Sequence, residues 1–146
     1  MKIKWPNDIL YDGRKIAGIL IENILRGSSL DYSVIGIGLN INQTEFQNSS
    51  ASSLRLITGL QFDINEKIEF LLMCIEKRYL HLKNGDHATM LKEYYARLYK
   101  FNEVSSYSCA SGTFQGTIRG VDEQGHLLIE KDKQISAFGF KEVQFL

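Results

Sequence analysis

Residues 34–42 alternate between large apolar side chains and small or amide side chains, and this pattern constrains the fold more than any other in the sequence. Strict alternation predicts a β-strand, because successive side chains of a strand point to opposite faces of its sheet. We expect the apolar face in a hydrophobic core; it consists of Ile35, Ile37, Leu39 and Ile41. The opposite face consists of Gly36, Gly38, Asn40 and Asn42.

This second face is unusual for a strand that only supports a core. A glycine within a strand loses conformational entropy and packs against nothing, so it usually marks close approach by another group. Two glycines followed by two amides predict either the floor of a site for a flat ligand or the seat of a closely packed helix. The strand alone leaves both interpretations open.

Two residues nearer the N-terminus extend the ligand interpretation. Gly18 lies within the apolar run 16–21 and has no obvious role in a turn. Lys4 lies on a short predicted strand beside the turn at Pro6-Asn7-Asp8. Most lysines are simply solvated, but a lysine directed at a glycine floor would bind a phosphate or a carboxylate.

The remaining pattern predicts a mixed α+β fold. Residues 14–24 and 32–42 read as long antiparallel strands, and Asp12-Gly13 as a hairpin turn. The polar segment 43–53 is expected to be an exposed loop. Apolar residues at helical spacing predict helices over 64–83, capped by Asp63, and over about 87–99.

The C-terminal part returns to β structure. Residues 113–121, 126–130 and 134–138 read as strands of a small barrel or sandwich. We therefore expect a larger α+β unit followed by a β module.

Composition excludes several classes of function. The 146 residues contain 17 Lys and Arg and 17 Asp and Glu, so the basic excess of a nucleic-acid-binding protein is absent. No apolar run approaches the roughly 18 residues of a membrane span. The two cysteines do not make a disulfide framework, and we expect a cytoplasmic location. The three histidines lack the spacing of a metal site.

Three segments in order resemble biotin protein ligases, which make biotinyl-adenylate and transfer biotin to a lysine of a carrier protein. They are residues 4–8 (KWPND), 13–22 (GRKIAGILIE) and 34–42 (VIGIGLNIN). The resemblance implies an antiparallel sheet packed with helices, as in class II aminoacyl-tRNA synthetases and biotin ligases. It implies the C-terminal part of the catalytic domain over residues 1–101 and an SH3-like β-barrel over residues 102–146.

The resemblance also implies a role for individual residues. Lys4 is the expected catalytic residue, a cation that contacts the biotin carboxyl and the adenylate phosphate as they join. The other expected binding residues are Ala17, Gly18, Ile19, Gly36, Gly38 and Asn40, with Asn40 at the adenine end. Trp5, Asn7 and Asp8 are expected to shape the turn that positions Lys4. ATP and biotin are the implied substrates, and Mg²⁺ would accompany ATP without a recognisable metal site.

One departure from the family limits the functional expectation. Nothing in residues 1–146 matches the Gly/Arg-rich loop of the family's upstream half, which closes over the adenylate. We therefore expect a C-terminal fragment that is inactive or weakly active alone. Its expected partners are a biotin carboxyl carrier protein and either the missing half or a second copy, without nucleic acid or membrane. The alternatives are a non-catalytic ligand-binding or protein-interaction module and a lipoate-ligase-like protein.

Overall fold

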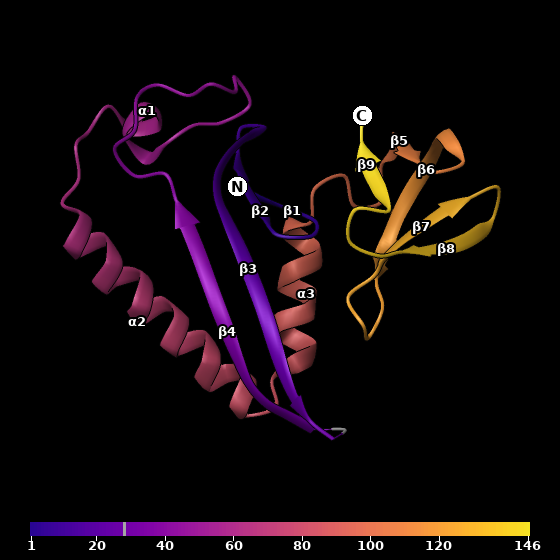
Figure 1. Ribbon diagram of the computed structural model, residues 1–146, viewed down its shortest axis with the longest axis horizontal. Coiled ribbons are helices and arrows are strands. Elements are labelled where there is room, and N and C mark those ends of the chain that lie inside the picture. Colours follow the sequence, from indigo (N-terminus) through magenta and orange to yellow (C-terminus); the bar gives the residue numbers. More distant parts are fainter. Residues whose placement is uncertain (28) are drawn as a thin grey trace. The chain divides into compact units, whose positions relative to one another are not determined.

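A computed structural model describes residues 1–27 and 29–146, and its elements divide between two units, Met1–Leu91 and Lys92–Leu146 (Figure 1). Ser28, in the polar connection between the two long strands, lies outside the described residues. Within the described ranges, no helix has both the length and the apolar character needed to span a membrane.

The N-terminal unit contains a four-stranded antiparallel sheet. Its strands are β1 (Lys2–Lys4), β2 (Asp8–Tyr11), β3 (Arg14–Arg26) and β4 (Ser29–Leu39), paired in chain order. Asp12 and Gly13 connect β2 to β3 with φ angles of 47° and 73°. Two consecutive positive φ angles define the tight hairpin turn that an Asp-Gly pair favours, so the expected meander is confirmed.

Two helices match the predicted helical periodicity closely, α2 (Ile64–Lys83) and α3 (His87–Arg97). The short helix α1 (Leu54–Thr58) is not predicted by the sequence pattern. The Asp63 side chain accepts a hydrogen bond from the backbone N–H of Glu66 and caps α2. α3 ends two residues earlier than expected.

Residues 43–50 lack helix and strand and are mostly exposed, as predicted, but the exposed-loop prediction is wrong at the end of its range, residues 52–53. Ser52 and Ser53 are fully buried. Ser53 caps α1, because its Oγ accepts from Leu56 N at 3.2 Å and donates to the Gln43 carbonyl at 2.6 Å. The Ser53 hydroxyl therefore makes its hydrogen bonds within the protein, whereas a hydroxyl in an exposed loop would make them with water.

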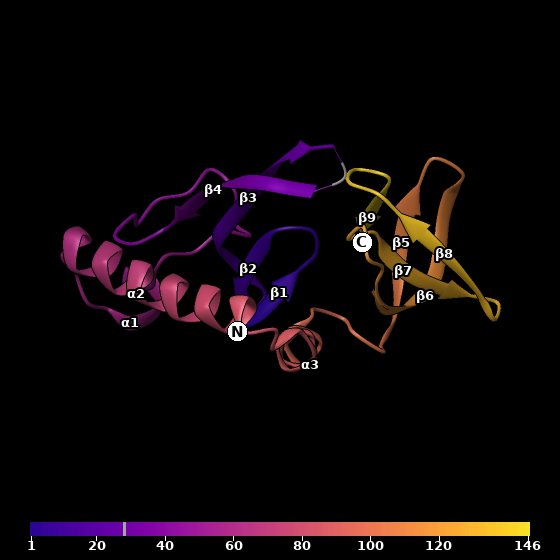
Figure 2. The same cartoon turned by 90° about the horizontal axis from the view of Figure 1, so that it is seen from below.

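The core of the N-terminal unit is small. Its buried apolar residues are Trp5, Leu10, Ile16 and Ala17. The expectation that the apolar face of residues 34–42 lies in a core is wrong for its first two residues, because Ile35 is 51% exposed and Ile37 is 37% exposed. α2 runs beside the β3–β4 hairpin in Figures 1 and 2, yet it has no buried residue. The described residues leave these apolar surfaces open to solvent.

The C-terminal unit contains β5 (Val104–Cys109), β6 (Gly112–Val121), β7 (Leu127–Lys131), β8 (Gln134–Phe138) and β9 (Val143–Phe145). They form one antiparallel sheet in the order β8-β7-β6-β5-β9. Its core contains Leu98, Tyr107, Ile118, Leu127 and Ile129, each at most 1% exposed.

The mixed helix and antiparallel-sheet class is confirmed, but the expected barrel is corrected to an open sheet. β8 pairs with β7, and the three-residue β9 pairs with β5. In the ranges described, β8 and β9 are the two edges and do not pair with each other. Closure would require a ladder between these edges.

Candidate functional site

Four candidate residues lie in one row across the N-terminal sheet. Lys4 of β1 is the register partner of Asp8 in β2, and Asp8 is the partner of Gly18 in β3. Gly18 is in turn the partner of Gly38 in β4. Directly opposed residues of antiparallel strands share a face of the sheet, so these four positions lie on one face. We call them the glycine row.

The next step along the strands continues the same face. Leu20 of β3 is the register partner of Gly36 in β4, two residues from Gly18 and Gly38 respectively. Because side chains alternate, Gly36 and Gly38 share this face with Lys4. The structure therefore brings a cation and three glycines, which are up to 34 residues apart in the chain, to one surface.

The glycines in β4 have no packing role within the described part of the chain. A Cβ added to Gly38 would be 3.9 Å from the Gly18 carbonyl oxygen, and one added to Gly36 would be 3.9 Å from the Leu20 carbonyl oxygen. Both distances are ordinary van der Waals contacts, and both glycines are exposed. A helix seated on these glycines would bury them, so no helix among the described residues explains their small size.

Gly18 differs from the other two glycines because charged groups surround it. A Cβ at Gly18 would be 3.3 Å from Lys15 Nζ and 3.6 Å from Asp8 Oδ1. Lys15 Nζ and Asp8 Oδ1 form an ion pair at 2.5 Å. The face above Gly18 is therefore occupied by a lysine–aspartate pair.

Ala17 and Ile19 lie on the opposite face. Ala17 pairs with Leu39 and Ile19 pairs with Ile37, so their side chains point away from the glycine row. They can line the row only through backbone atoms. Ile19 also donates its N–H to the Asn7 carbonyl at 2.9 Å, which ties the turn after Lys4 to β3.

Asn40 lies at the end of β4 and is partly buried. Its Nδ2 donates to the Ser52 carbonyl at 3.0 Å, and its backbone N–H donates to the Ile16 carbonyl at 2.9 Å. These bonds hold the Asn40 amide in place beside the sheet. Asn42 has a structural role instead, since its amide exchanges two hydrogen bonds with the backbone of Phe62.

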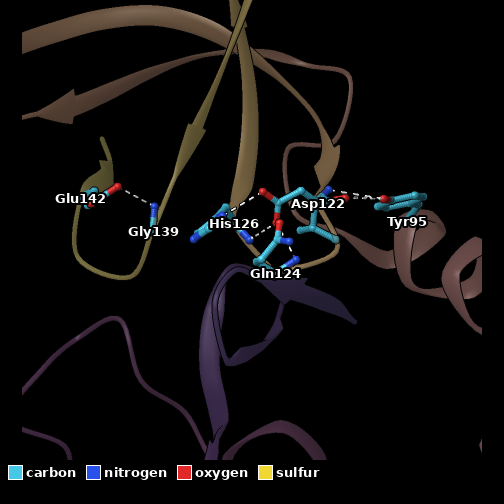
Figure 3. Close-up of polar contacts among 7 residues, drawn as sticks. Tyr95, Asp122, Gln124, His126, Gly139 and Glu142 are labelled. Carbon is cyan, nitrogen blue, oxygen red and sulfur yellow. Dashed lines mark hydrogen bonds and ion pairs between the residues drawn. The ribbon is translucent and has the colours of Figure 1, made fainter. Parts of the chain in front are cut away.

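Polar clusters in the C-terminal unit are turns and caps (Figure 3). Asp122 accepts from the backbone of Gln124 and His126 and pairs with His126 Nδ1 at 2.8 Å. Burial raises the pKa of the Asp122 carboxyl, but the hydrogen bonds from His126 outweigh it, so the pKa lies below its ordinary value. Tyr95 Oη accepts from Val121 N at 3.3 Å and fastens the chain before β5 to the end of β6.

Two cavities are lined by residues outside the glycine row. A cavity of about 680 Å³ in the C-terminal unit is lined by residues that include Cys109, Ser111 and Lys141. Another, of about 660 Å³, lies along residues 43–51. Residues 1–27 and 29–146 contain no cluster of three His, Cys, Asp or Glu side chains that would hold a metal ion. Gly38 is exposed, so the sheet surface at this end of the glycine row is open to solvent.

Lys15 is the residue of this surface that sequence reasoning missed. Lys15 follows the Asp12-Gly13 turn by two residues, and the sequence analysis assigns it no role. The pairing of β2 with β3 shifts between Ile9 and Leu10, so that Leu10 pairs with Lys15 whereas Ile9 pairs with Ala17. Such a bulge redirects a side chain, and no local sequence signal predicted it.

Comparisons with known proteins agree on one family. Residues 1–40 match the model of the biotin/lipoate A/B protein ligase family. The chain is 36% identical over 140 residues to the bifunctional ligase/repressor BirA of Bacillus subtilis, covering 91% of this chain and 42% of that protein. It is 31% identical over 130 residues to the biotin–[acetyl-CoA-carboxylase] ligase of Mycobacterium tuberculosis, covering 88% of this chain and 47% of that one.

Solved structures give the same result. The apo biotin protein ligase of Aquifex aeolicus superposes with a TM-score of 0.77 at 26% identity, covering 99% of this chain and 64% of that chain. The same protein in complex with biotin and ATP gives a TM-score of 0.74 at 25% identity, covering 99% and 62%. The chain thus spans less than half the length of these two curated relatives and under two thirds of these solved chains.

Proposed function

Because the chain belongs to the biotin protein ligase family, we propose that its glycine row is one wall of a biotinyl-adenylate site. In the complete enzyme this site would activate biotin with ATP and pass biotin to a lysine of a carrier protein. The observation that carries the proposal is the register that aligns Lys4, Asp8, Gly18 and Gly38 on one face.

The surface suits a flat, anionic ligand. Gly36 and Gly38 leave the backbone of β4 open to close approach, and a ligand can lie on it without displacing a side chain. Lys4, at the end of the row, would place its charge against the carboxylate and the α-phosphate as they join. A fixed cation stabilises the negative charge that this transition state gathers.

Asn40 would contribute at the adenine end. Its Nδ2 is engaged by the Ser52 carbonyl, so its Oδ1 is the atom that remains to accept a hydrogen bond from the adenine amino group. ATP and biotin are the proposed substrates, as in the Aquifex complex with biotin and ATP. The described carboxylates do not form a metal site, so Mg²⁺ is proposed only as the ion that accompanies ATP.

The isolated chain is proposed to be inactive or weakly active, because only one wall of the site is present. The exposed faces of the β3–β4 hairpin support this proposal. Leu20 and Val34 are 57% and 51% exposed on the glycine side, and Ile21 and Ile35 are 55% and 51% exposed on the other. A strand pair that is apolar on both faces is normally buried between two layers. Further ligase polypeptide, or a second copy of this chain, would bury these faces.

The two units are proposed to have different roles. We propose that the N-terminal unit is the C-terminal part of a catalytic domain and that the open sheet of the C-terminal unit is the SH3-like module of the family. The proposed acceptor is a biotin carboxyl carrier protein.

Calorimetry with biotin, ATP, lipoate and a biotinyl-adenylate analogue tests the proposal. We expect the adenylate analogue to bind more tightly than biotin, and Lys4→Met to weaken its binding. Lys77→Met on exposed α2 is the matched control, because it removes the same charge elsewhere in the same unit. Absence of binding would instead favour a non-catalytic interaction module, and preference for lipoate would favour a lipoate-ligase-like protein.

A second assay tests activity directly. The chain is mixed with biotin, ATP, Mg²⁺ and an apo carrier domain, with and without the part of the Aquifex aeolicus ligase that lies outside the structural match. We expect little labelled carrier from the chain alone. Robust labelling by the isolated chain would contradict the fragment proposal.

A further inference from the structure

The position of Lys15 suggests more than a surface ion pair. Its Nζ lies 3.3 Å, and its Cε 3.4 Å, from the point where a Cβ on Gly18 would stand. A larger side chain at position 18 would therefore press on this ammonium group. Glycine at this position leaves room for Lys15 on the ligand side of the sheet.

The backbone of Lys15 is held on both sides. Its N–H donates to the Ser50 carbonyl at 2.7 Å, and its carbonyl accepts from Ser52 N at 2.8 Å. A parallel bridge joins Lys15 to Ala51 at the same place. Lys15 is thus anchored by the bulge and by the segment before α1, unlike a lysine at the tip of a free turn.

The Lys15 ammonium group lies within reach of a ligand. Asp8 is the register partner of Lys4 and the ion-pair partner of Lys15. The Lys15 ammonium group is therefore held on the face of the sheet that also carries Lys4 and Gly38. The Lys15 and Asp8 side chains are 46% and 26% exposed, so a bound ligand can reach the pair.

We propose that Lys15 is a second ligand-binding cation of this site, contacting an anionic group of a ligand that lies over Gly36 and Gly38. Asp8 holds the ammonium group above Gly18, and the ligand's carboxylate or phosphate shares it. This inference rests on the proposed function and adds a recognition residue to it. A carboxylate and a phosphate both accept hydrogen bonds from a lysine ammonium group. The experiment below decides which of the two Lys15 contacts.

The experiment measures binding of four probes by calorimetry: biotin, biotin methyl ester, AMP and adenosine. Biotin methyl ester lacks the carboxylate charge of biotin, and adenosine lacks the phosphate of AMP. The proteins are the wild-type chain, Lys15→Met, Lys15→Arg and the control Lys77→Met. Solvent weakens a hydrogen bond between an exposed ammonium group and an anion, so Lys15→Met should weaken binding of an anionic probe about three- to tenfold. Lys15→Arg should stay within about twofold of wild type.

Each outcome bears on the inference. A loss confined to biotin supports a contact with the carboxylate, and a loss confined to AMP supports a contact with the phosphate. An equal loss for a neutral partner would show that Lys15 only maintains the fold and would overturn the inference, as would unchanged binding of both anions.

The failure of this inference is separable from that of the proposed function. If Lys4→Met weakens the anionic probes and Lys15→Met does not, the site stands and the role of Lys15 is refuted. If the wild-type chain binds none of the four probes, both proposals are overturned. Thermal unfolding of Lys15→Met, compared with wild type, accompanies each measurement.

Discussion

Replacing Gly38 and Gly116 by alanine should have opposite effects on stability, although both are strand glycines with φ outside the left-handed region. At Gly38 the added Cβ meets nothing closer than 3.9 Å. At Gly116 it would be 2.6 Å from Ile129 Cγ2 and 3.0 Å from the Glu130 carbonyl oxygen. The Glu130 backbone cannot rotate away as a flexible side-chain end would.

The magnitudes follow from these distances. Gly38→Ala should stabilise its unit by about 0.4–1 kcal/mol, because alanine restricts the unfolded chain without a clash. Gly116→Ala should cost about 1–3 kcal/mol through overpacking in the core of its unit. With a urea m-value of about 1–1.5 kcal/mol/M for a small unit, Gly116→Ala should lower the urea midpoint of the C-terminal unit by about 0.7–3 M.

Each unit needs its own probe, since unfolding of two units need not be a single transition. Fluorescence of the single, buried Trp5 reports on the N-terminal unit. Amide exchange of peptides from β6 and β7 reports on the C-terminal unit. If Gly38→Ala destabilises its unit as much as Gly116→Ala does, a covering element packs on Gly38 in solution and the open-floor reasoning is refuted. Under the proposed function, Gly38→Val should keep the fold and lose adenylate binding.

Three further predictions concern single side chains. Ser53→Ala should lower the stability of the N-terminal unit by about 1–3 kcal/mol in urea unfolding, because it removes a cap and a part-buried hydrogen bond to the Gln43 carbonyl; a change below about 0.5 kcal/mol would contradict this. The pKa of Asp122 is depressed in the folded state, so its contribution to stability is complete above the ordinary Asp pKa of about 3.9 and declines as pH falls through the folded value. Amide protection at His126 should decline with it, and Asp122→Asn should abolish that dependence. The hydrogen bond with Ser111 lowers the pKa of the Cys109 thiol. Ser111→Ala should therefore slow alkylation of Cys109 by iodoacetamide at pH 7.5, as followed by mass spectrometry. An unchanged rate would show that this hydrogen bond does not activate the thiol.

Local patterns predicted most of the elements. Helix α2 covers the predicted range 64–83 and begins after its cap at Asp63, and the Asp12-Gly13 turn joins β2 to β3 as expected. These features depend on neighbours within a few residues, whose geometry is encoded locally. The strands β5 and β9 were not assigned, and β9 is only three residues long. Such a short strand is stabilised by its partner and has little pattern of its own.

Burial was predicted less well. Alternation places Ile35 and Ile37 on one face, but a face becomes a core only when another layer covers it. The described residues do not provide that layer, and both side chains remain exposed. Conversely, polar Ser53 is fully buried because a helix end supplied partners for its hydroxyl.

The amino-acid sequence specifies which residue types are available for the site: a lysine, three strand glycines and an amide, in segments that resemble one family. The tertiary structure decided their arrangement, because register is set by pairing between strands that are distant in sequence. Pairing places Lys4, Asp8, Gly18 and Gly38 in one row and turns Ala17 and Ile19 away from it. It also brought Lys15 to the row through a bulge, a property of two strands together that neither strand encodes alone.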